Sequence, residues 1–371
     1  MRYTVNKKRI LIVSNNSKYL SSHRGKIISY LADKYKVSIC SPKSKIYFKK
    51  YFCHENFVEG GYNGFFYELK KLFKLIKIIK SDKPDLIYVI SIKPCLCILI
   101  LNFFLRYKVL YSITGLGYIF SDNSNFFLKS LVKFSFKIFN IKKNYFIFQN
   151  KYELNFFRNL INIYQKSYLI SGTGIETKIK KRKINYKKLR IILPSRMLYD
   201  KGIRDFVNIS QIVNRKFKNT FFYLIGGTDK NNPMNIGFYE IKNILKDKNR
   251  IEWLGYKKNL NKIFRNAFLT CFPSYHEGSP RTLIESSSYG VPIVCYDIPG
   301  NRNIVKNNFN GYRVKIYNYN FLAKKIENII YDKQLYKQMC KNSIIISKKF
   351  NHNLINNKFN KIVSKIINAK N

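Results

Sequence analysis

The sequence is poor in acidic side chains. It contains 20 Asp and Glu residues against 69 Lys and Arg, which gives a formal net charge of +49 at pH 7. No two aspartates form an Asp-x-Asp pair. Because Mg²⁺ and Ca²⁺ prefer carboxylate and other oxygen ligands, we expect no bound metal, and we expect no other cofactor.

The sequence also lacks a long hydrophobic run. The best one, CLCILILNFFL (95–105), is interrupted by Asn102 and is far shorter than the roughly 20 apolar residues of a membrane-spanning helix. The apolar stretch near the start is shorter than the ~7–15 residues of a signal-peptide core. We therefore expect neither a membrane span nor a targeting segment.

The cysteines do not indicate a metal site or a disulfide framework. All seven occur without a CxxC pair, their number is odd, and most stand in apolar, strand-like runs. This usage is typical of reduced thiols that pack as small hydrophobic side chains in the cytosol. We expect all seven to be buried.

The positive charge has three explanations. Lys, Asn, Ile, Tyr and Phe are over-used together, as an A+T-rich coding sequence would produce, and we favour this compositional drift. Docking on an anionic membrane ranks second, since each basic residue near the surface contributes about 1 kcal/mol. Nucleic-acid binding ranks third, because the lysines are spread along the chain without a recognisable binding motif.

Apolar, strand-like runs alternate with helical patterns twice along the chain. The first series of predicted strands covers 9–15, 36–41, 86–91, 109–115 and 144–150, and the second covers 190–196, 220–227, 250–255, 269–274 and 291–297. This alternation predicts an α/β fold of two doubly wound, Rossmann-like domains that face a central cleft. We expect domains at 1–165 and 166–345, and a helical tail at 346–371 that packs toward the first domain.

Two glutamates stand eight residues apart in YHEGSPRTLIES (275–286). Ser279 and Pro280 predict a helix start, with serine as the cap and proline in the first turn. The free amides at such a start attract anions, and the carboxylates of Glu277 and Glu285 suit vicinal hydroxyls. The stretch therefore indicates a site for a sugar nucleotide. The alternative is an ordinary helix cap with solvated glutamates.

Two cations follow the first strand of the second series, in PSRMLYDKG (194–202). At the carboxyl end of a parallel strand, Arg196 and Lys201 could neutralise a diphosphate leaving group without a metal ion. The alternative is that they are two surface cations among 69.

Three weaker signals lie elsewhere. SGTGIE (171–176) and ITGLGYIF (113–120) place glycines where the backbone could approach a ligand closely. LSSHRGK (20–26) places His23 between the first strand and the first helix. A lone histidine is more often structural, so the residues alone do not decide between a structural and a functional role for His23.

The order of these motifs resembles the retaining GT-B glycosyltransferases of family 4. The resemblance rests on E-x7-E, here Glu277 to Glu285, on GVPIV after it, and on R-x4-K-G, here Arg196 to Gly202. It covers nearly the whole chain. The segments SSHRGK, ITGLGYIF and FIFQN resemble the bacterial subgroup that adds a hexose or N-acetylhexosamine to undecaprenyl-diphosphate-linked glycans.

The resemblance assigns roles to individual residues. Arg196 and Lys201 would contact the diphosphate of the donor and assist its departure, Glu277 would face the transferred sugar, and Glu285 would bind the ribose. The loop around sugar and phosphate, and the floor beneath it, would be formed by Gly278, Ser279, Pro280, Arg281, Thr282, Gly172 and Gly174.

On the acceptor side, His23 would meet the sugar from the first domain and would count with Arg196, Lys201 and Glu277 among the catalytic residues. Arg24, Gly115 and Gly117 would line the acceptor's entry. Two positions depart from the family pattern, because Glu176 stands where Asp is usual and Asn303 stands where an acid is common.

The resemblance implies transfer of a sugar from a nucleotide donor, expected to be UDP-linked, to a lipid-linked saccharide. The predicted basic amphipathic helices, 68–80 and 126–143, would hold the protein on the anionic inner face of the bacterial cytoplasmic membrane, facing the cytoplasm. An acceptor that is soluble or diacylglycerol-based is an alternative. A basic nucleic-acid-binding protein is the alternative from another class, although we expect no nucleic-acid partner.

Overall fold

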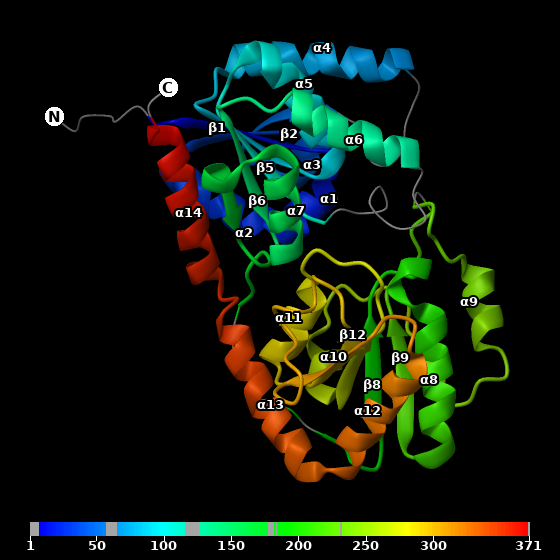
Figure 1. Cartoon of the computed structure of the whole chain (residues 1–371). Coiled ribbons are helices and arrows are strands. Elements are labelled where there is room, and N and C mark those ends of the chain that lie inside the picture. The colour runs from blue at the N-terminus through cyan, green and yellow to red at the C-terminus, as the bar shows by residue number, and fades with distance from the viewer. Residues whose placement is uncertain are drawn as a thin grey trace. The chain divides into compact units, whose positions relative to one another are not determined.

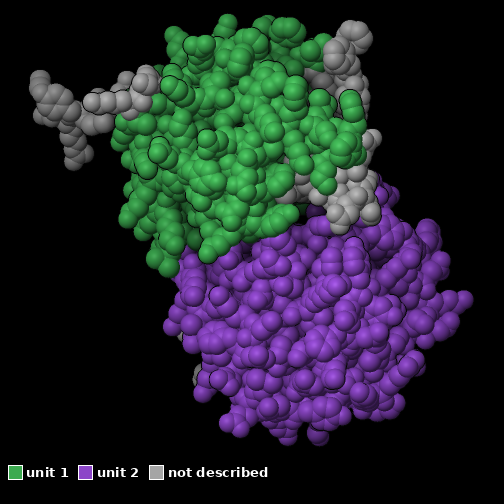
Figure 2. Space-filling model, in the orientation of Figure 1, with its two compact units in different colours: residues 1–173, 352–371 green, residues 174–351 purple. Residues whose placement is uncertain are grey.

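The computed structural model describes residues 7–56, 65–115, 126–176, 182, 184–230 and 232–369. The chain forms two compact units (Figures 1 and 2). Unit 1 comprises Met1–Thr173 and His352–Asn371, and unit 2 comprises Gly174–Asn351. Each unit has its own parallel sheet with helices on both faces, which confirms the predicted α/β fold of two doubly wound, Rossmann-like domains.

Unit 1 is built on a seven-stranded sheet in the order β3-β2-β1-β4-β5-β6-β7, and all its strands run parallel. The strands are β1 (Arg9–Ser14), β2 (Lys36–Ser41), β3 (Phe52–Glu55), β4 (Leu86–Ile90), β5 (Val109–Ile113), β6 (Asn144–Phe148) and β7 (Ser167–Leu169). Every residue of β4 and β5 is buried. Continuous apolar strands of this kind are what a sheet covered on both faces requires.

The helices of unit 1 divide between the two faces of its sheet. They are α1 (Ser17–Tyr19), the π-helical turn η1 (Leu20–Arg24), α2 (Gly25–Lys34), α3 (Ser44–Tyr47), α4 (Phe65–Asp82), α5 (Ile92–Leu105), α6 (Phe126–Ile138), α7 (Lys151–Ile161), the 3-10 turn η3 (Tyr164–Lys166) and α14 (His352–Asn368). Leu11 and Val13 of β1 pack with α4 to α7, whereas Ile10 and Ile12 pack with α2 and α14. The period of two along the strand thus separates two cores.

Unit 2 repeats the plan with a six-stranded parallel sheet in the order β10-β9-β8-β11-β12-β13. The strands are β8 (Leu189–Pro194), β9 (Thr220–Ile225), β10 (Ile251–Trp253), β11 (Leu269–Phe272), β12 (Ile293–Tyr296) and β13 (Gly311–Val314). The helical elements are the 3-10 turn η4 (Tyr199–Lys201), α8 (Ile203–Lys216), α9 (Phe238–Leu245), α10 (Asn261–Asn266), α11 (Arg281–Ser288), α12 (Tyr319–Tyr331) and α13 (Lys333–Lys348).

The strand order reverses once in each sheet. The reversal falls between β1 and β4 in unit 1 and between β8 and β11 in unit 2. At such a point the connections leave toward opposite faces, so the carboxyl ends of the two strands border an open crevice that commonly binds ligands. These two places are therefore the first to inspect for a functional site.

Several elements depart from the expectations. The sequence did not predict β3, β7 and β13, which are short edge strands with polar residues among the apolar ones. The unit boundaries lie a few residues later than expected, because β7 completes the first sheet and α13 stays with unit 2. The cysteines are all free, but Cys53, Cys97 and Cys340 are only half-buried, so the expectation of full burial is wrong for these three.

The apolar run 95–105 is the larger part of α5, and its one polar residue is buried. The side-chain amide of Asn102 donates to the carbonyl oxygen of Tyr107 at 3.0 Å and to Oδ1 of Asn144 at 2.9 Å. Its own Oδ1 accepts from the amide of Tyr107 at 2.8 Å. A buried polar group that makes these bonds does not disrupt the core. No helix among the described residues is both long enough and apolar enough to cross a membrane.

The last helix is expected to contribute to the stability of unit 1. Phe359 of α14 is 1% exposed, and its ring lies 5.0 Å from that of Tyr88 in β4. We predict that Phe359→Ala lowers the free energy of unfolding by about 3–5 kcal/mol, because it leaves a cavity. Leu354→Ala, on the same helix at a side chain that is 50% exposed, should change it by less than about 0.5 kcal/mol. Urea denaturation of the two variants would contradict the packing if their midpoints shifted equally.

Candidate functional site in unit 2

The expected donor residues gather at the carboxyl edge of the sheet in unit 2. Arg196 follows the end of β8 by two residues, and Lys201 closes the η4 turn after it. Glu277 lies in the loop between β11 and α11. Since β8 and β11 are neighbours in the sheet and run parallel, the loops that follow them lie next to each other at the point where the strand order reverses.

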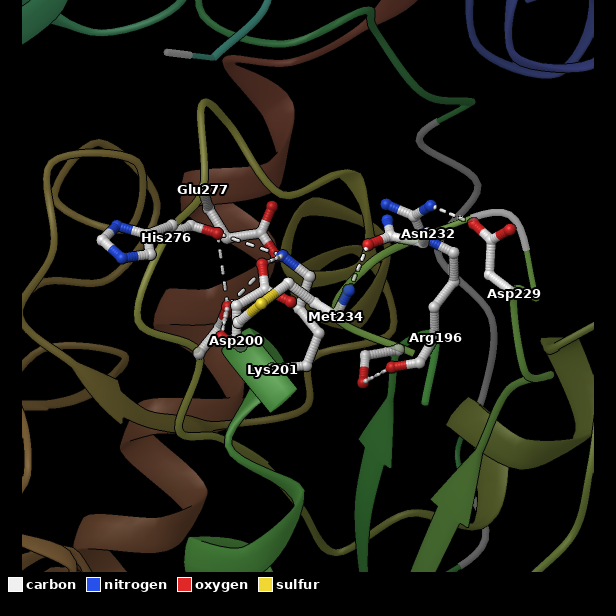
Figure 3. A network of polar contacts seen from close by, with 10 residues as sticks. Arg196, Asp200, Lys201, Asp229, Asn232, Met234, His276 and Glu277 are labelled. Carbon is white, nitrogen blue, oxygen red and sulfur yellow. Dashed lines mark hydrogen bonds and ion pairs between the residues drawn. The ribbon is translucent and has the colours of Figure 1, made fainter. Parts of the chain in front are cut away.

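Lys201 is the centre of this site. Its ammonium nitrogen lies 3.0 Å from Oδ2 of Asp200 and 3.0 Å from Oε1 of Glu277, and it donates to the carbonyl oxygen of His276 at 3.1 Å (Figure 3). The residue is buried. Burial alone would lower the pKa of Lys201, but the carboxylates of Glu277 and Asp200 outweigh it and raise the pKa above its usual value. Lys201 is thus a buried, permanently charged cation.

Close backbone approaches hold these loops together. Gly202, at φ +69°, lies so close to β11 that a Cβ atom there would stand 2.0 Å from the carbonyl oxygen of Pro273. A Cβ on Gly300 would likewise stand 2.3 Å from the carbonyl oxygen of Glu277. Only glycine fits both places without a backbone shift. The amide of Tyr275 also donates to the carbonyl oxygen of Asp200 at 2.9 Å, which joins the two loops directly.

A tyrosine pair anchors the loop that carries Glu277. The hydroxyl of Tyr275 donates to Oδ2 of Asp205 in α8 at 2.8 Å, and the hydroxyl of Tyr296 donates to the same oxygen. The two rings are stacked, with centroids 5.7 Å apart. Sequence reasoning missed Asp200, Asp205 and both tyrosines. Asp200 and Tyr275 stand inside the quoted motifs, but no pattern revealed their partners, because the pairing is tertiary.

Arg196 lies on the other side of the site and pairs with a different acid. Its Nη1 lies 2.7 Å from Oδ2 of Asp229, and its side chain is 58% exposed (Figure 3). The loop that carries Asp229 is tied to the β8 loop, since the amide of Met197 donates to the carbonyl oxygen of Gly227 at 3.0 Å. Arg196 is therefore an accessible cation, whereas Lys201 is an internal one.

Helix α11 begins one residue later than expected. Pro280 is its N-cap and makes no side-chain capping bond, so the expectation that Ser279 caps the helix is wrong. The hydroxyl of Ser279 is instead buried without a hydrogen-bond partner. Thr282 lies in the first turn as expected, and Nε of Arg281 is 2.7 Å from Oε1 of Glu285. The positive end of the α11 dipole and the Ser279 hydroxyl form an anion-attracting group beside the motif.

The remaining expected residues lie outside this cluster. Gly172 and Gly174, both at φ +76°, stand where the chain passes from unit 1 to unit 2. His23 and Arg24 belong to η1 of unit 1. Gly115, at φ +132°, follows β5, while Gly117 lies outside the described residues. Among the described residues, no three His, Cys, Asp or Glu side chains are grouped closely enough to hold a metal ion.

Two family models match the chain, one in each unit. The model described as "Glycosyl transferases group 1" matches residues 174–345, and that described as "Glycosyl transferase 4-like" matches residues 9–150. The first match contains Lys201, Glu277 and Glu285, and the second contains the reversal of strand order between β1 and β4 in unit 1. These matches favour an enzyme over the nucleic-acid-binding alternative.

Named relatives of the chain act on lipid-linked glycans. An N,N'-diacetylbacillosaminyl-diphospho-undecaprenol alpha-1,3-N-acetylgalactosaminyltransferase of Campylobacter jejuni is 25% identical over 323 residues, which is 81% of this chain and 82% of the relative. A UDP-Gal:alpha-D-GlcNAc-diphosphoundecaprenol alpha-1,3-galactosyltransferase of Escherichia coli is 25% identical over 136 residues, covering 36% of this chain and 34% of the relative.

Solved structures show the same fold. Sucrose-phosphate synthase of Thermosynechococcus elongatus superposes with a TM-score of 0.80 at 16% identity, over 98% of this chain and all of that one. HepE of Anabaena, solved with UDP and glucose, gives 0.77 at 17% identity, over 96% of this chain and 99% of that one. These likenesses show the GT-B fold. The two matching models, one in each unit, show that the chain belongs to the family 4 glycosyltransferases.

Proposed function

We propose that the chain transfers a hexose or N-acetylhexosamine from a UDP-sugar to a lipid-linked saccharide, with retention of anomeric configuration, in the synthesis of a bacterial surface glycan. The buried Lys201–Glu277 pair beside the start of α11 is the observation on which this proposal rests. The UDP and glucose bound in HepE and the undecaprenol-linked acceptors named for two relatives support the choice of donor and acceptor.

In this proposal the diphosphate of the donor meets Lys201, the accessible Arg196, the amides of α11 and the hydroxyl of Ser279. The bond from the anomeric carbon to the leaving phosphate oxygen breaks, and a bond to the acceptor oxygen forms on the same face. The acceptor's proton passes to the leaving phosphate. Fixed cations and dipoles that stabilise the departing charge supply much of the rate, and no metal is required for that neutralisation.

In this scheme Glu277 contacts both Lys201 and the transferred sugar. One of its oxygens holds the Lys201 ammonium at 3.0 Å, so it fixes the cation that the leaving group needs. A carboxylate can accept further hydrogen bonds, which lets Glu277 also meet a hydroxyl of the transferred sugar. Glu285, half-buried and paired with Arg281, would bind the ribose hydroxyls from within α11.

The acceptor is assigned to unit 1, which carries a surface suited to a membrane. Helices α4, α5 and α6 pack on one another along one face of its sheet (Figure 1). They expose large apolar side chains, namely Phe73, Phe103, Phe104, Phe126, Phe127, Leu131, Phe134 and Ile138. We call these residues the aromatic surface.

Basic side chains accompany the aromatic surface. Exposed lysines on α4 and α6 are Lys70, Lys74, Lys77, Lys80 and Lys137. In α6, Val132 and Phe136 are buried in the core of unit 1. The exposed phenylalanines of this helix are therefore not needed for packing against the sheet. Apolar and cationic side chains on adjacent helices suit an anionic lipid surface.

Lys201→Ala tests the leaving-group role. We predict that turnover of a UDP-sugar falls roughly a hundred- to a thousandfold, the loss expected for one charge-stabilising group. A panel of UDP-sugars, with a synthetic prenyl-diphosphate saccharide as acceptor, would identify the donor and give the rates. Lys262→Ala, at an exposed lysine of the same unit, is the matched control. The role of Lys201 is refuted if the two variants have equal turnover rates. If the alanine variant unfolds, Lys201→Met, which preserves side-chain bulk, replaces it in the test.

Glu285→Ala tests donor binding separately. Loss of a charged hydrogen bond to the ribose should weaken UDP binding about ten- to a hundredfold, measured by isothermal titration calorimetry. Glu252→Ala, at an exposed glutamate on β10, should leave the dissociation constant of UDP unchanged. Identical UDP affinities for wild type and Glu285→Ala would remove Glu285 from the site.

Phe104→Ser and Phe134→Ser test the aromatic surface at side chains that are 74% and 60% exposed. A phenylalanine side chain that inserts into the membrane gains about 1.5–3 kcal/mol of transfer free energy. Each change should therefore lower partitioning onto phosphatidylglycerol-containing vesicles by about tenfold or more at low salt. Co-sedimentation measures this, with Tyr239→Ser in unit 2, 81% exposed, as control. Wild-type protein that pellets no more than a neutral soluble protein would exclude membrane docking.

A further inference from the structure

Unit 1 contains a buried arginine at its own strand-order reversal. Arg24 ends η1, the turn that follows β1, and it lies beside Tyr88 of β4. Because β1 and β4 are the pair at which the order reverses, Arg24 occupies in unit 1 the topological place that Lys201 occupies in unit 2.

Unlike Lys201, Arg24 has no acidic partner among the residues that the structure describes. It is 2% exposed, and among the described residues no carboxylate comes within ion-pair distance of it. Its Nε and Nη2 atoms are buried and make no hydrogen bond. The polar groups that face it are the phenols of Tyr19, which is hydrogen-bonded to the guanidinium, and of Tyr88. An isolated buried charge is costly for a fold, so the absence of a counter-charge needs an explanation.

The surrounding hydroxyl groups cannot supply that charge. Burial raises the pKa of Tyr88 above its usual value, although Arg24 beside it acts in the opposite direction, so the phenol stays neutral. Ser112 of β5 is paired with Ile90 of β4. Its hydroxyl and that of Tyr88 approach each other and are buried with no well-formed hydrogen bond. Hydroxyl donors from β4 and β5 thus lie near a guanidinium that has no counter-charge among the described residues.

The backbone next to this cluster is strained. Ser91 follows β4 directly and has φ +81° and ψ 150°, a region that essentially only glycine visits without cost. Ser91 is also the N-cap of α5, a helix of 14 residues. Its conformation turns the chain so that α5 begins at the carboxyl edge of β4. In this first turn Pro94 has no amide hydrogen and the amide of Cys95 donates to the carbonyl oxygen of Ser91 at 3.1 Å, so the amide of Ile92 is the one nearest this edge.

We propose that Arg24 is the cation of a phosphoryl-binding site in unit 1. The guanidinium fork would receive two phosphoryl oxygens side by side, the hydroxyls of Tyr88 and Ser112 would donate to them, and the positive end of α5, with the amide of Ile92, would face them. His23, whose ring stacks on Tyr19 at 4.5 Å, lies at the rim. This proposal rests on the proposed function, and it identifies the group that unit 1 recognises as a phosphate of the acceptor lipid or a free phosphate.

The test keeps the donor site filled. Full-length protein is saturated with UDP, and binding of geranyl diphosphate and of inorganic phosphate is measured by calorimetry. We expect geranyl diphosphate to bind and Arg24→Met to weaken it about tenfold or more, with the dissociation constant of UDP unchanged. Arg158→Met is the control, because this half-buried arginine of unit 1 already donates to the hydroxyl of Ser167 at 2.8 Å.

Stability separates a binding role from a structural one. Removing a buried charge that has no counter-charge among the described residues should leave the melting temperature of the ligand-free protein unchanged or higher, whereas an arginine that holds the fold together would lower it on replacement. Arg24→Lys retains the charge but loses the fork, and it should bind the probe more weakly than wild type. This variant keeps the proposal testable if Arg24→Met does not fold.

The outcomes are distinct. The site is overturned if neither probe binds to the UDP-saturated protein, or if wild type and Arg24→Met bind the probes equally. In either case UDP still binds, so the proposed function is not affected. Failure of UDP itself to bind overturns the proposed function instead. Preference for geranyl diphosphate over inorganic phosphate assigns the site to the acceptor lipid, and equal affinity assigns it to a free phosphate.

Discussion

The buried ammonium of Lys201 sets the geometry of unit 2. A charge can be kept inside a protein only where partners compensate the loss of water, and here Asp200, Glu277 and a carbonyl oxygen do so at about 3 Å. Those partners come from two different loops, so the loops must meet with little tolerance. Gly202 and Gly300 allow that approach because a side chain at either position would collide with backbone, and Asp205 fixes the second loop through two tyrosines.

The two units share one topology but surround the cation at the reversal of strand order differently. Parallel strands bring loops together at the reversal of strand order, whatever the residues are. In unit 2 the cation at that place is neutralised by the protein, so an anion that arrives must share Lys201 with its carboxylates. In unit 1 no carboxylate of the described residues pairs with Arg24, and an anion would meet a full positive charge. The first arrangement suits a leaving group whose charge grows during reaction, while the second suits a group whose charge does not change.

The sequence predicted the parts of this design that depend on local pattern. Apolar runs located most strands, and the spacing of Arg196, Lys201, Glu277 and Glu285 located the loops at one edge. It could not reveal that Pro280, and not Ser279, is the N-cap of α11, because a shift of one residue in the helix start leaves the sequence pattern unchanged. Nor could it show Asp205 between Tyr275 and Tyr296, since these residues meet only after β11, β12 and α8 have packed.

The large net charge and the single charges of the site act over different distances. At physiological salt an exposed charge is screened beyond about 8 Å, so the many surface lysines can attract an anionic donor or membrane but cannot replace a cation in contact with the leaving group. Compositional drift can account for lysines that remain in water. It does not account for Lys201, whose burial demanded two acids from a chain that has only 20. What distinguishes Lys201 from the other cations is therefore its desolvation together with its partners.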